Sequence, residues 1–257
     1  MKVALTGATS GIGAGVAAKL HELGHQLVAF DIHEPKARVD HWIKVDMADP
    51  ASIERAADEA GGGFDALINN AGLPPREGLE EAILRVNYCG LVQFLDLMIP
   101  KLTPGASIVN TASRAGAKWR ESLDEIKALM ALDPADLEEF IETRAISSTR
   151  AYVLSKEAVI VYTMAATQRM IAQNLRMNSV SPAAVSTGIL DDFTAAFGDA
   201  VKVNLALVGR PGAVGEIADV IVFLASPASA WIKGQDIVID GGMSALKLVE
   251  MLELDHC

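Results

Sequence analysis

Cysteine is scarce in this chain of 257 residues, which contains only Cys89 and Cys257. Two cysteines so far apart make no disulfide framework of the kind on which small secreted domains depend. We therefore expect a reducing, cytoplasmic setting, with Cys257 as a free thiol at the terminus.

Basic residues and long apolar runs are also lacking. Lys and Arg number 22 against 33 Asp and Glu, a formal charge of −11, which argues against nucleic-acid partners and against an anionic membrane surface. We expect no apolar run to reach the length of about 20 residues that a bilayer span requires. The start, Met1 to Leu5, leads directly into a glycine turn, so we expect no signal peptide.

Apolar residues, in contrast, make up 51% of the chain, enough for a sizeable core. They gather in short continuous runs separated by helical patterns, an alternation typical of strands buried on both faces of a parallel sheet. The expected strands are 3–6, 26–30, 42–45, 66–68, 107–110, 176–180 and 236–239, and the expected helices include 52–60, 80–98, 152–173 and 214–224. The pattern predicts an α/β fold with one doubly wound, seven-stranded parallel sheet, in a single domain covering 1–257.

One segment, 119–149, interrupts this alternation. Within it 123–132 and 136–144 have helical patterns, and Asp133 with Pro134 fits a helix start. We interpret the segment as a helical insertion before the helix that carries Tyr152. A plain surface insertion and a role in oligomerisation or at a substrate entrance remain alternatives.

The first strand leads into a glycine-rich turn, Thr6 to Gly13, which opens a helix. Glycines at this place let backbone amides approach a pyrophosphate at the helix N-terminus. The second strand ends at Asp31, 31 − 13 = 18 residues after Gly13. An acid at about this separation holds the adenosine ribose, and it would repel a 2′-phosphate. NAD is therefore favoured over NADP, although His33, Lys36 or Arg38 could accept a phosphate.

Tyr152 and Lys156 lie four residues apart in a helical pattern, so their side chains share one helix face. A nearby ammonium favours phenolate over phenol, and we expect Lys156 to lower the pKa of Tyr152. A tyrosine in that state can exchange a proton with a substrate near neutral pH. The pair alone is common on solvated helices, so its meaning depends on the other motifs.

Together the motifs resemble those of the short-chain dehydrogenase/reductase family from residue 3 to about residue 242. The matching segments, in chain order, are Thr6-Gly7-Ala8-Thr9-Ser10-Gly11-Ile12-Gly13, Val45-Asp46-Met47, Asn69-Asn70-Ala71-Gly72, Asn87, Ser113, Tyr152 with Lys156, Arg176-Met177-Asn178 and Ile239-Asp240-Gly241-Gly242. The length and the place of the insertion resemble the bacterial 3α-hydroxysteroid dehydrogenase/carbonyl reductase subgroup. In that subgroup the insertion blocks a tetramer contact, which implies a homo-oligomer, with a dimer favoured over a tetramer.

The resemblance implies a site for NAD and a catalytic set, and it implies no metal. The implied catalytic residues are Asn87, Ser113, Tyr152 and Lys156. The implied cofactor-binding residues are Gly7, Thr9, Ser10, Gly11, Ile12, Gly13, Asp31, Asp46, Met47, Asn70, Ala71, Gly72, Tyr152, Lys156, Pro182, Val185 and Thr187. Tyr152 would exchange the proton, Lys156 would hold the nicotinamide ribose, Ser113 would donate to the substrate oxygen, and Asn87 would hold a water linked to Lys156. One departure is Ala183, where the family has glycine, so the local backbone is expected to differ.

The substrate is expected to be an uncharged, largely apolar secondary alcohol or ketone, with a hydroxysteroid as one alternative. The segment 188–197 reads as a mobile amphipathic helix whose apolar side chains either line a lid or pack on the core. These side chains are Ile189, Leu190, Phe193 and Phe197. Trp119 is a further candidate for the entrance, and Arg114 is not clearly placed to hold a substrate anion. A non-catalytic dinucleotide sensor and a nucleotide-sugar epimerase or dehydratase are the competing functions.

Overall fold

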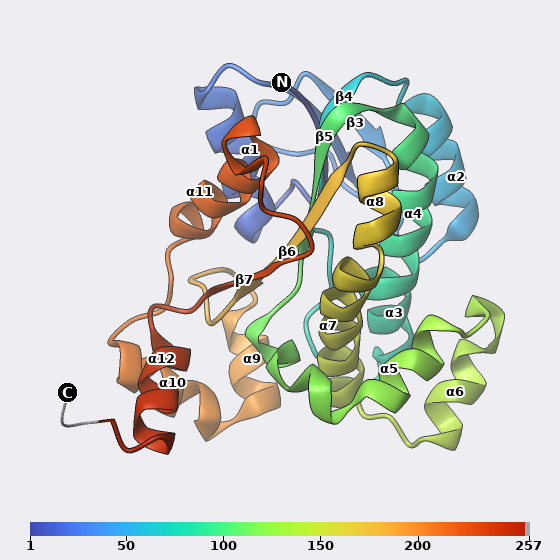
Figure 1. Cartoon of the computed structure of the whole chain (residues 1–257). Coiled ribbons are helices and arrows are strands. Elements are labelled where there is room, and N and C mark those ends of the chain that lie inside the picture. Colours follow the sequence, from blue (N-terminus) through green and yellow to red (C-terminus); the bar gives the residue numbers. More distant parts are fainter. Residues whose placement is uncertain (255–257) are drawn as a thin grey trace.

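The computed structural model describes residues 1–254 of the chain, so Cys257 lies outside the described residues (Figure 1). Within these residues seven strands pair in parallel in one sheet of order β3-β2-β1-β4-β5-β6-β7, which is the predicted doubly wound fold. The strands are β1 (Lys2–Thr6), β2 (Gln26–Asp31), β3 (His41–Lys44), β4 (Phe64–Asn69), β5 (Leu102–Thr111), β6 (Arg176–Pro182) and β7 (Asp236–Ile239).

The strand order reverses around β1, which pairs with β2 on one side and with β4 on the other. Thr6 at the end of β1 is in register with Phe30 of β2 and with Asn69 of β4, so three strand ends meet there. In open α/β sheets such a reversal leaves a crevice beyond the carboxyl ends of the strands.

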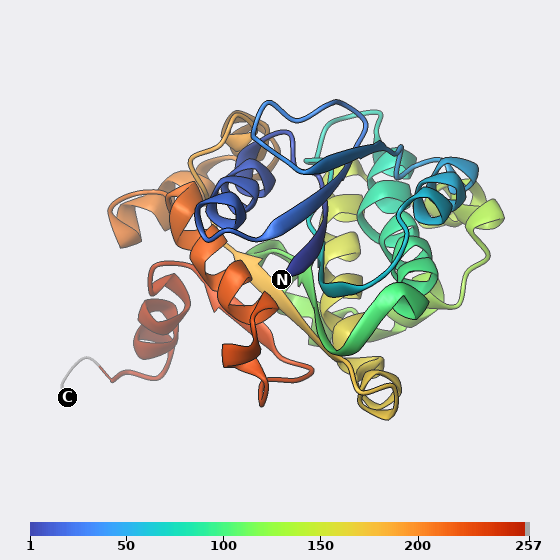
Figure 2. The same ribbon diagram turned by 90° about the horizontal axis from the view of Figure 1, so that it is seen from above.

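Helices cover both faces of the sheet (Figures 1 and 2). One face packs on α1 (Gly11–Glu22) and α11 (Val214–Ala225), and the other on α2 (Pro50–Glu59), α4 (Leu91–Met98), α7 (Ser148–Ala165) and α8 (Thr167–Ala172). The remaining α-helices are α3 (Glu80–Leu84), α5 (Leu123–Met130), α6 (Leu137–Thr143), α9 (Leu190–Phe197), α10 (Asp199–Val208) and α12 (Met243–Met251). The shorter turns are η1 (Arg85–Gly90), η2 (Ile99–Lys101), η3 (Arg114–Glu121), η4 (Pro134–Asp136) and η5 (Pro227–Ser229).

The predicted helix 80–98 is interrupted by η1, one turn of π-helix that carries the buried Asn87. The whole stretch Glu80–Lys101 has 22 residues and is apolar enough to span a bilayer, contrary to the expectation that no such run exists. Half of its most apolar window is buried inside the protein. Phe94, Leu95 and Met98 are fully buried in the core against the sheet, so the composition of this stretch is explained by packing.

The segment 119–149 forms the predicted helices α5 and α6 beside α7. The Asp133 carboxylate accepts a hydrogen bond from the Ala135 amide at 2.9 Å, and Pro134 begins η4, as the sequence indicates. Trp119 lies with Arg120 stacked on its ring and packs on the cluster around α7 rather than at the cavity. The prediction that it reaches the substrate entrance is therefore wrong.

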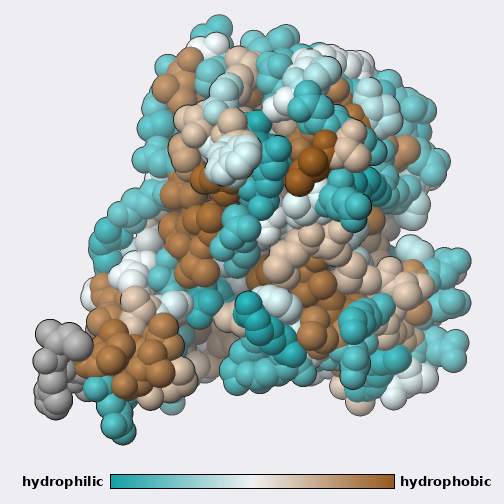
Figure 3. Space-filling model, viewed as in Figure 1, coloured by the Kyte–Doolittle hydropathy of each residue, from teal (hydrophilic) through white to brown (hydrophobic). Residues whose placement is uncertain are grey.

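Two helices were not anticipated from the sequence, α10 and α12, and both lie below the sheet near the C-terminus (Figure 1). Apolar side chains of α10 and of the C-terminal segment are exposed and form a hydrophobic area of the surface (Figure 3).

Helix α7 begins four residues before the predicted start, where the Ser147 hydroxyl accepts a hydrogen bond from the Arg150 amide at 3.2 Å.

Candidate active site

The glycine turn after β1 leaves the start of α1 open. Gly7 has a φ of +72°, which favours glycine, and its amide donates to the Phe30 carbonyl at 2.9 Å. Ser10 precedes α1 in an extended conformation, and its hydroxyl forms no capping bond with the described residues. The first-turn amides of α1 are thus available for an anion such as a pyrophosphate.

Gly13 lets α1 pack closely against this turn. A Cβ atom at Gly13 would overlap the Gly7 carbonyl oxygen and come within 2.6 Å of Nδ2 of Asn70. Gly13 therefore lies behind the turn and outside the cavity lining, whereas it was predicted among the cofactor-binding residues. Its role is to let α1 approach the turn.

The loop after β4 is fastened to the loop after β1. The Thr6 hydroxyl oxygen accepts hydrogen bonds from the amides of Asn70 at 3.0 Å and Ala71 at 3.1 Å. Nδ2 of Asn70 donates to the Gly7 carbonyl at 3.1 Å. These bonds fix the two loops on either side of the crevice, so the motif Asn69–Gly72 supports the glycine turn directly.

Asp31 ends β2 beside the glycine turn. One carboxylate oxygen accepts from the Thr9 amide at 2.9 Å and the other from the His33 amide at 3.2 Å. His33 lines the cavity beside Asp31, while Lys36 and Arg38 lie outside its lining. The Asp31 carboxylate therefore lies at the end of the crevice that a dinucleotide fold uses for the adenosine ribose, and neither Lys36 nor Arg38 lines that end.

A continuous cavity of about 1250 Å³ runs from this turn to the ends of β5 and β6. The predicted residues that line it are Gly7, Thr9, Ser10, Gly11, Ile12, Asp31, Asp46, Met47, Asn70, Ala71, Gly72, Ser113, Tyr152, Lys156, Pro182, Val185 and Thr187. The structure thus brings together all the predicted site residues except Gly13 and Asn87, which lie behind the wall.

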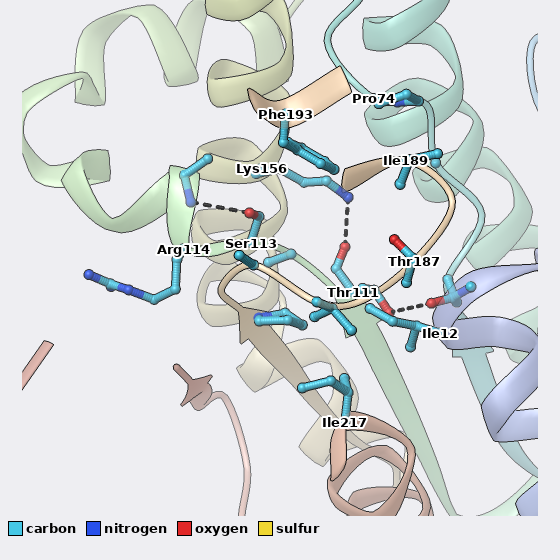
Figure 4. Close-up of a pocket in the computed structure, with 18 of the residues that line it drawn as sticks. Ile12, Pro74, Thr111, Ser113, Arg114, Lys156, Thr187, Ile189, Phe193 and Ile217 are labelled. Carbon is cyan, nitrogen blue, oxygen red and sulfur yellow. Dashed lines mark hydrogen bonds between the residues drawn. The ribbon is translucent and has the colours of Figure 1, made fainter. Parts of the chain in front are cut away.

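Ser113 and Tyr152 meet at the far end of the cavity. Ser113 follows β5 and starts η3, where its hydroxyl oxygen accepts from the Ala115 amide at 3.2 Å (Figure 4). Tyr152 is only 5% exposed on α7. Burial raises the pKa of Tyr152 to about 12, and a hydrogen bond with Ser113 lowers it in part.

Lys156 lies one turn further along α7, and its Nζ donates to the Thr111 carbonyl at 2.9 Å (Figure 4). Its ammonium is 5.8 Å from the centre of the Tyr152 ring, on the same helix face as predicted. Burial lowers the pKa of Lys156 to about 8. The expectation that Lys156 lowers the pKa of Tyr152 is not met, because burial penalises the charged form of both groups and it is Ser113 that lowers the tyrosine pKa in part.

Asn87 lies behind the wall, where its amide fastens two segments. Its Oδ1 accepts from the Leu73 amide at 2.7 Å, while its Nδ2 lies 3.1 Å from the Leu73 carbonyl and 3.2 Å from the Ser155 hydroxyl. The Ser155 hydroxyl in turn donates to the Tyr152 carbonyl at 2.7 Å. Asn87 thereby connects the loop after β4 to the helix that carries Tyr152 and Lys156.

The segment 188–197 lies over Tyr152 rather than in the core. Phe193 and Phe197 of α9 meet the Tyr152 ring edge-on, with centroids 5.2 Å and 6.4 Å away. Every residue of α9 and α10 keeps some exposure. Ile189, Phe193 and Phe197 line the cavity, as the lid interpretation requires, whereas Leu190 lies outside its lining.

The cavity wall also includes residues that the motifs do not mark. These are mostly apolar residues such as Leu73, Pro74, Val86, Val201, Leu205 and Met243. In the sequence, only the helical spacing of 188–197 predicted any part of this wall. The segments that form α10 and α12 carried no pattern that predicted their place in it. Ala183 lines the cavity too, and its φ lies outside the left-handed region, so the replacement of glycine there introduces no backbone strain.

The chain matches two family models, "short chain dehydrogenase" over residues 1–123 and "Enoyl-(Acyl carrier protein) reductase" over residues 137–244. It is 30% identical to the coniferyl-alcohol dehydrogenase of Pseudomonas sp. (strain HR199 / DSM 7063), over 95% of this chain and 96% of that one. It is 27% identical to the 3-alpha-hydroxysteroid dehydrogenase/carbonyl reductase of Comamonas testosteroni, with the same coverages.

Among solved structures, the 3-alpha-hydroxysteroid dehydrogenase from Pseudomonas sp. B-0831 complexed with NADH superposes with a TM-score of 0.85 at 28% identity. The match covers 96% of this chain and 98% of that one. Sequence motifs, sheet topology and relatives agree over almost the whole length. The chain therefore belongs to the short-chain dehydrogenase/reductase family of oxidoreductases, which act on alcohol and carbonyl groups.

Proposed function

We propose that this protein transfers a hydride reversibly between NAD(H) and an uncharged, largely apolar secondary alcohol or ketone. The observation that carries the proposal is the meeting of Ser113, Tyr152 and Lys156 at the apolar end of a cavity whose other end is the glycine turn. A buried proton donor beside such a cavity suits the protonation of a carbonyl oxygen.

The residues around the glycine turn fit a bound dinucleotide. The uncapped start of α1 would hold the pyrophosphate, and Asp31 would hold the adenosine ribose. Asp46 and Met47 line the wall where the adenine would lie, and Thr187 lines the nicotinamide end. The bound nicotinamide would supply or accept the hydride. We favour NAD because the Asp31 carboxylate would repel a 2′-phosphate.

Tyr152 is proposed to give its proton to the substrate oxygen in reduction and to take it back in oxidation. Ser113 would donate a hydrogen bond to the same oxygen while negative charge develops there. Lys156 would hold the nicotinamide ribose. Asn87 would act behind the wall by fixing α7 and by holding a water near Lys156, since Gly72 lies against both side chains.

The proposed substrate class follows from the wall of the far end. Ile189, Phe193 and Phe197 present apolar surface to the cavity. Arg114 lines it too, but its guanidinium lies 3.5 Å from the Asp240 carboxylate, which balances its charge. An uncharged ring ketone or alcohol fits this wall best, and a hydroxysteroid is the more specific candidate because two of the similar proteins carry that name.

A panel of steroid, terpenoid and aryl ketones with NADH and NADPH in parallel tests the proposal through the absorbance at 340 nm. We expect turnover of at least one ketone class, faster with NADH. A clear preference for NADPH would overturn the argument from Asp31. Tight NADH binding without turnover of any ketone or alcohol would instead favour the non-catalytic sensor.

We also propose a cytoplasmic homo-oligomer, with a dimer favoured over a tetramer. Strand β7 is one edge of the sheet, and its Val238 is exposed, as is Phe223 of α11. Trp231, in the turn before β7, is 95% exposed. An open strand edge flanked by exposed apolar side chains suits pairing with another copy. Analytical ultracentrifugation measures the state directly, and a monomer at micromolar concentration would contradict the proposal.

A further inference from the structure

The lid is the segment 187–211, which contains α9 and α10 and lies over Tyr152. Its base is closed by a β-bridge between Val185 and Gly212, with the Gly212 amide donating to the Ala184 carbonyl at 2.9 Å. Gly198, between α9 and α10, and Gly209, after α10, have positive φ values that favour glycine, so the chain turns sharply at the end of each short helix. A segment built this way can move as a unit about its base.

An ion pair fastens this lid to the opposite wall of the cavity. Nε and NH2 of Arg76 donate to the two carboxylate oxygens of Asp192 at 2.9 Å and 2.8 Å. Arg76 belongs to the loop after β4 and Asp192 to the first turn of α9, so the pair joins segments 116 residues apart. This parallel two-bond geometry is the strong form of an arginine–carboxylate contact.

Both partners lie outside the cavity lining, so they can affect a reaction only through their neighbours. The neighbour of Asp192 is Phe193, whose ring packs on Tyr152 at 5.2 Å and stacks with Phe197 at 6.4 Å. On the other side, Leu73 of the Arg76 loop is bonded twice to Asn87. The ion pair thus connects the lid aromatics to the segment that positions α7.

We propose that the Arg76–Asp192 ion pair, here called the clasp, positions Phe193 over Tyr152 and thereby sets the affinity of this site for its substrate. The proposal rests on the proposed function, because it assigns Tyr152 to the reacting end of the cavity. Arg76 and Asp192 are positioning residues. The clasp draws α9 onto a bound apolar substrate, and its release lets the lid open for exchange.

Steady-state kinetics of Asp192→Asn, Arg76→Gln and the double variant test the clasp. Because one partly exposed ion pair shifts an equilibrium modestly, we expect each single variant to raise the ketone KM two- to fivefold, with a smaller change in kcat. The double variant is expected to resemble either single one, and Asp192→Glu to keep part of the effect. Unchanged KM values in both single variants, or additive effects in the double one, would overturn the proposal.

Salt provides a readout that loss of stability would not reproduce. Raising NaCl from 50 to 500 mM screens an exposed pair, so the wild-type KM should rise towards that of the double variant. The KM of the double variant should stay constant. The matched control is Asp96→Asn, which breaks the Arg169–Asp96 pair between α8 and α4 at 2.7 Å, away from the cavity. It should leave the KM and its salt dependence as in the wild type.

Hydrogen–deuterium exchange tests the clasp without any substrate. The amides of α9 should exchange faster in Asp192→Asn and Arg76→Gln than in the wild type, while those of α4 and α8 stay unchanged. Equal exchange in α9 would overturn the clasp. If the wild type turns over no ketone or alcohol, the proposed function fails, whereas the exchange result still decides whether the clasp holds the lid.

Discussion

The two ends of the cavity are formed by different kinds of structural element. The end that we propose to hold the cofactor is formed largely by backbone, with the Asp31 carboxylate beside it: the glycine turn, the uncapped start of α1, and loops joined to strands such as β1, which is buried from Val3 to Thr6. The substrate end consists of side chains that stand on a lid, and every residue of α9 and α10 keeps some exposure. The cofactor end is held by the core itself, whereas the lid is held by a few contacts such as the clasp.

This difference leads us to expect that the end beside the glycine turn tolerates fewer substitutions than the end beneath the lid. A turn whose amides face a pyrophosphate works only if neighbouring backbones approach closely, which restricts particular positions to glycine. An apolar wall needs only side chains of suitable size, and many combinations provide it. Four substitutions, taken from the largest expected effect to the smallest, separate the two ends.

Tyr152→Phe should remove the chemistry and leave the cofactor end intact. Without the phenol no group delivers the proton, and we expect kcat to fall by about 10³-fold or more. The affinity for NADH, measured by fluorescence titration, should change less than twofold. Tyr162→Phe, which removes a hydroxyl bonded to Arg169 outside the site, is the control. Substantial turnover by Tyr152→Phe would remove Tyr152 from its proposed role.

Gly13→Ala should do the reverse and damage the cofactor end. The added methyl would overlap the Gly7 carbonyl, so α1 or the turn must move. We expect the dissociation constant of NADH to rise about 100-fold and the free energy of unfolding to fall by about 2 kcal/mol. Gly215→Ala in α11, where a Cβ meets open space, is the control measured by the same titration and by urea unfolding. Wild-type NADH affinity in Gly13→Ala would contradict the packing argument.

Lys156→Met tests the electrostatic cost of burial where the two ends meet. The pKa of Lys156 is lowered from 10.5 to about 8, so between these values the unfolded chain binds a proton that the folded protein does not. The contribution of Lys156 to the free energy of unfolding therefore rises with pH across that window, by up to about 3 kcal/mol. Urea unfolding at pH 7.5, 8.5 and 9.5 should show this rise in the wild type relative to Lys156→Met. Parallel curves for the two proteins would show that Lys156 titrates at its ordinary pKa.

Phe193→Ala should weaken the substrate end alone. It removes the ring that covers Tyr152, and we expect the ketone KM to rise about tenfold while NADH binding is unchanged. The exposed Ile171 on α8 supplies the control Ile171→Ala. An effect confined to NADH affinity would assign Phe193 to the cofactor end instead.

The sequence predicted the fold around the glycine turn and most of the residues that line the cavity there. All seven strands, the glycine turn and Asp31 could be placed because short apolar runs and glycines carry local signals. Gly13 and Asn87 were predicted as site residues, but a motif does not reveal whether a residue faces the cavity or packs behind it. The pKa of Tyr152 was misjudged for a similar reason, because burial depends on Phe193 and Phe197 from a distant segment.

Local pattern by itself determined the order of strands and helices, the family and the residues that we propose to carry the chemistry. Each of these depends on neighbours in the chain: a period of two or four residues, a glycine at a turn, a pair on one helix face. The tertiary structure alone decided the lid over Tyr152, the clasp between Arg76 and Asp192, and the direction of the pKa shifts. Those features arise from segments up to 116 residues apart, and no local spacing encodes which of them meet.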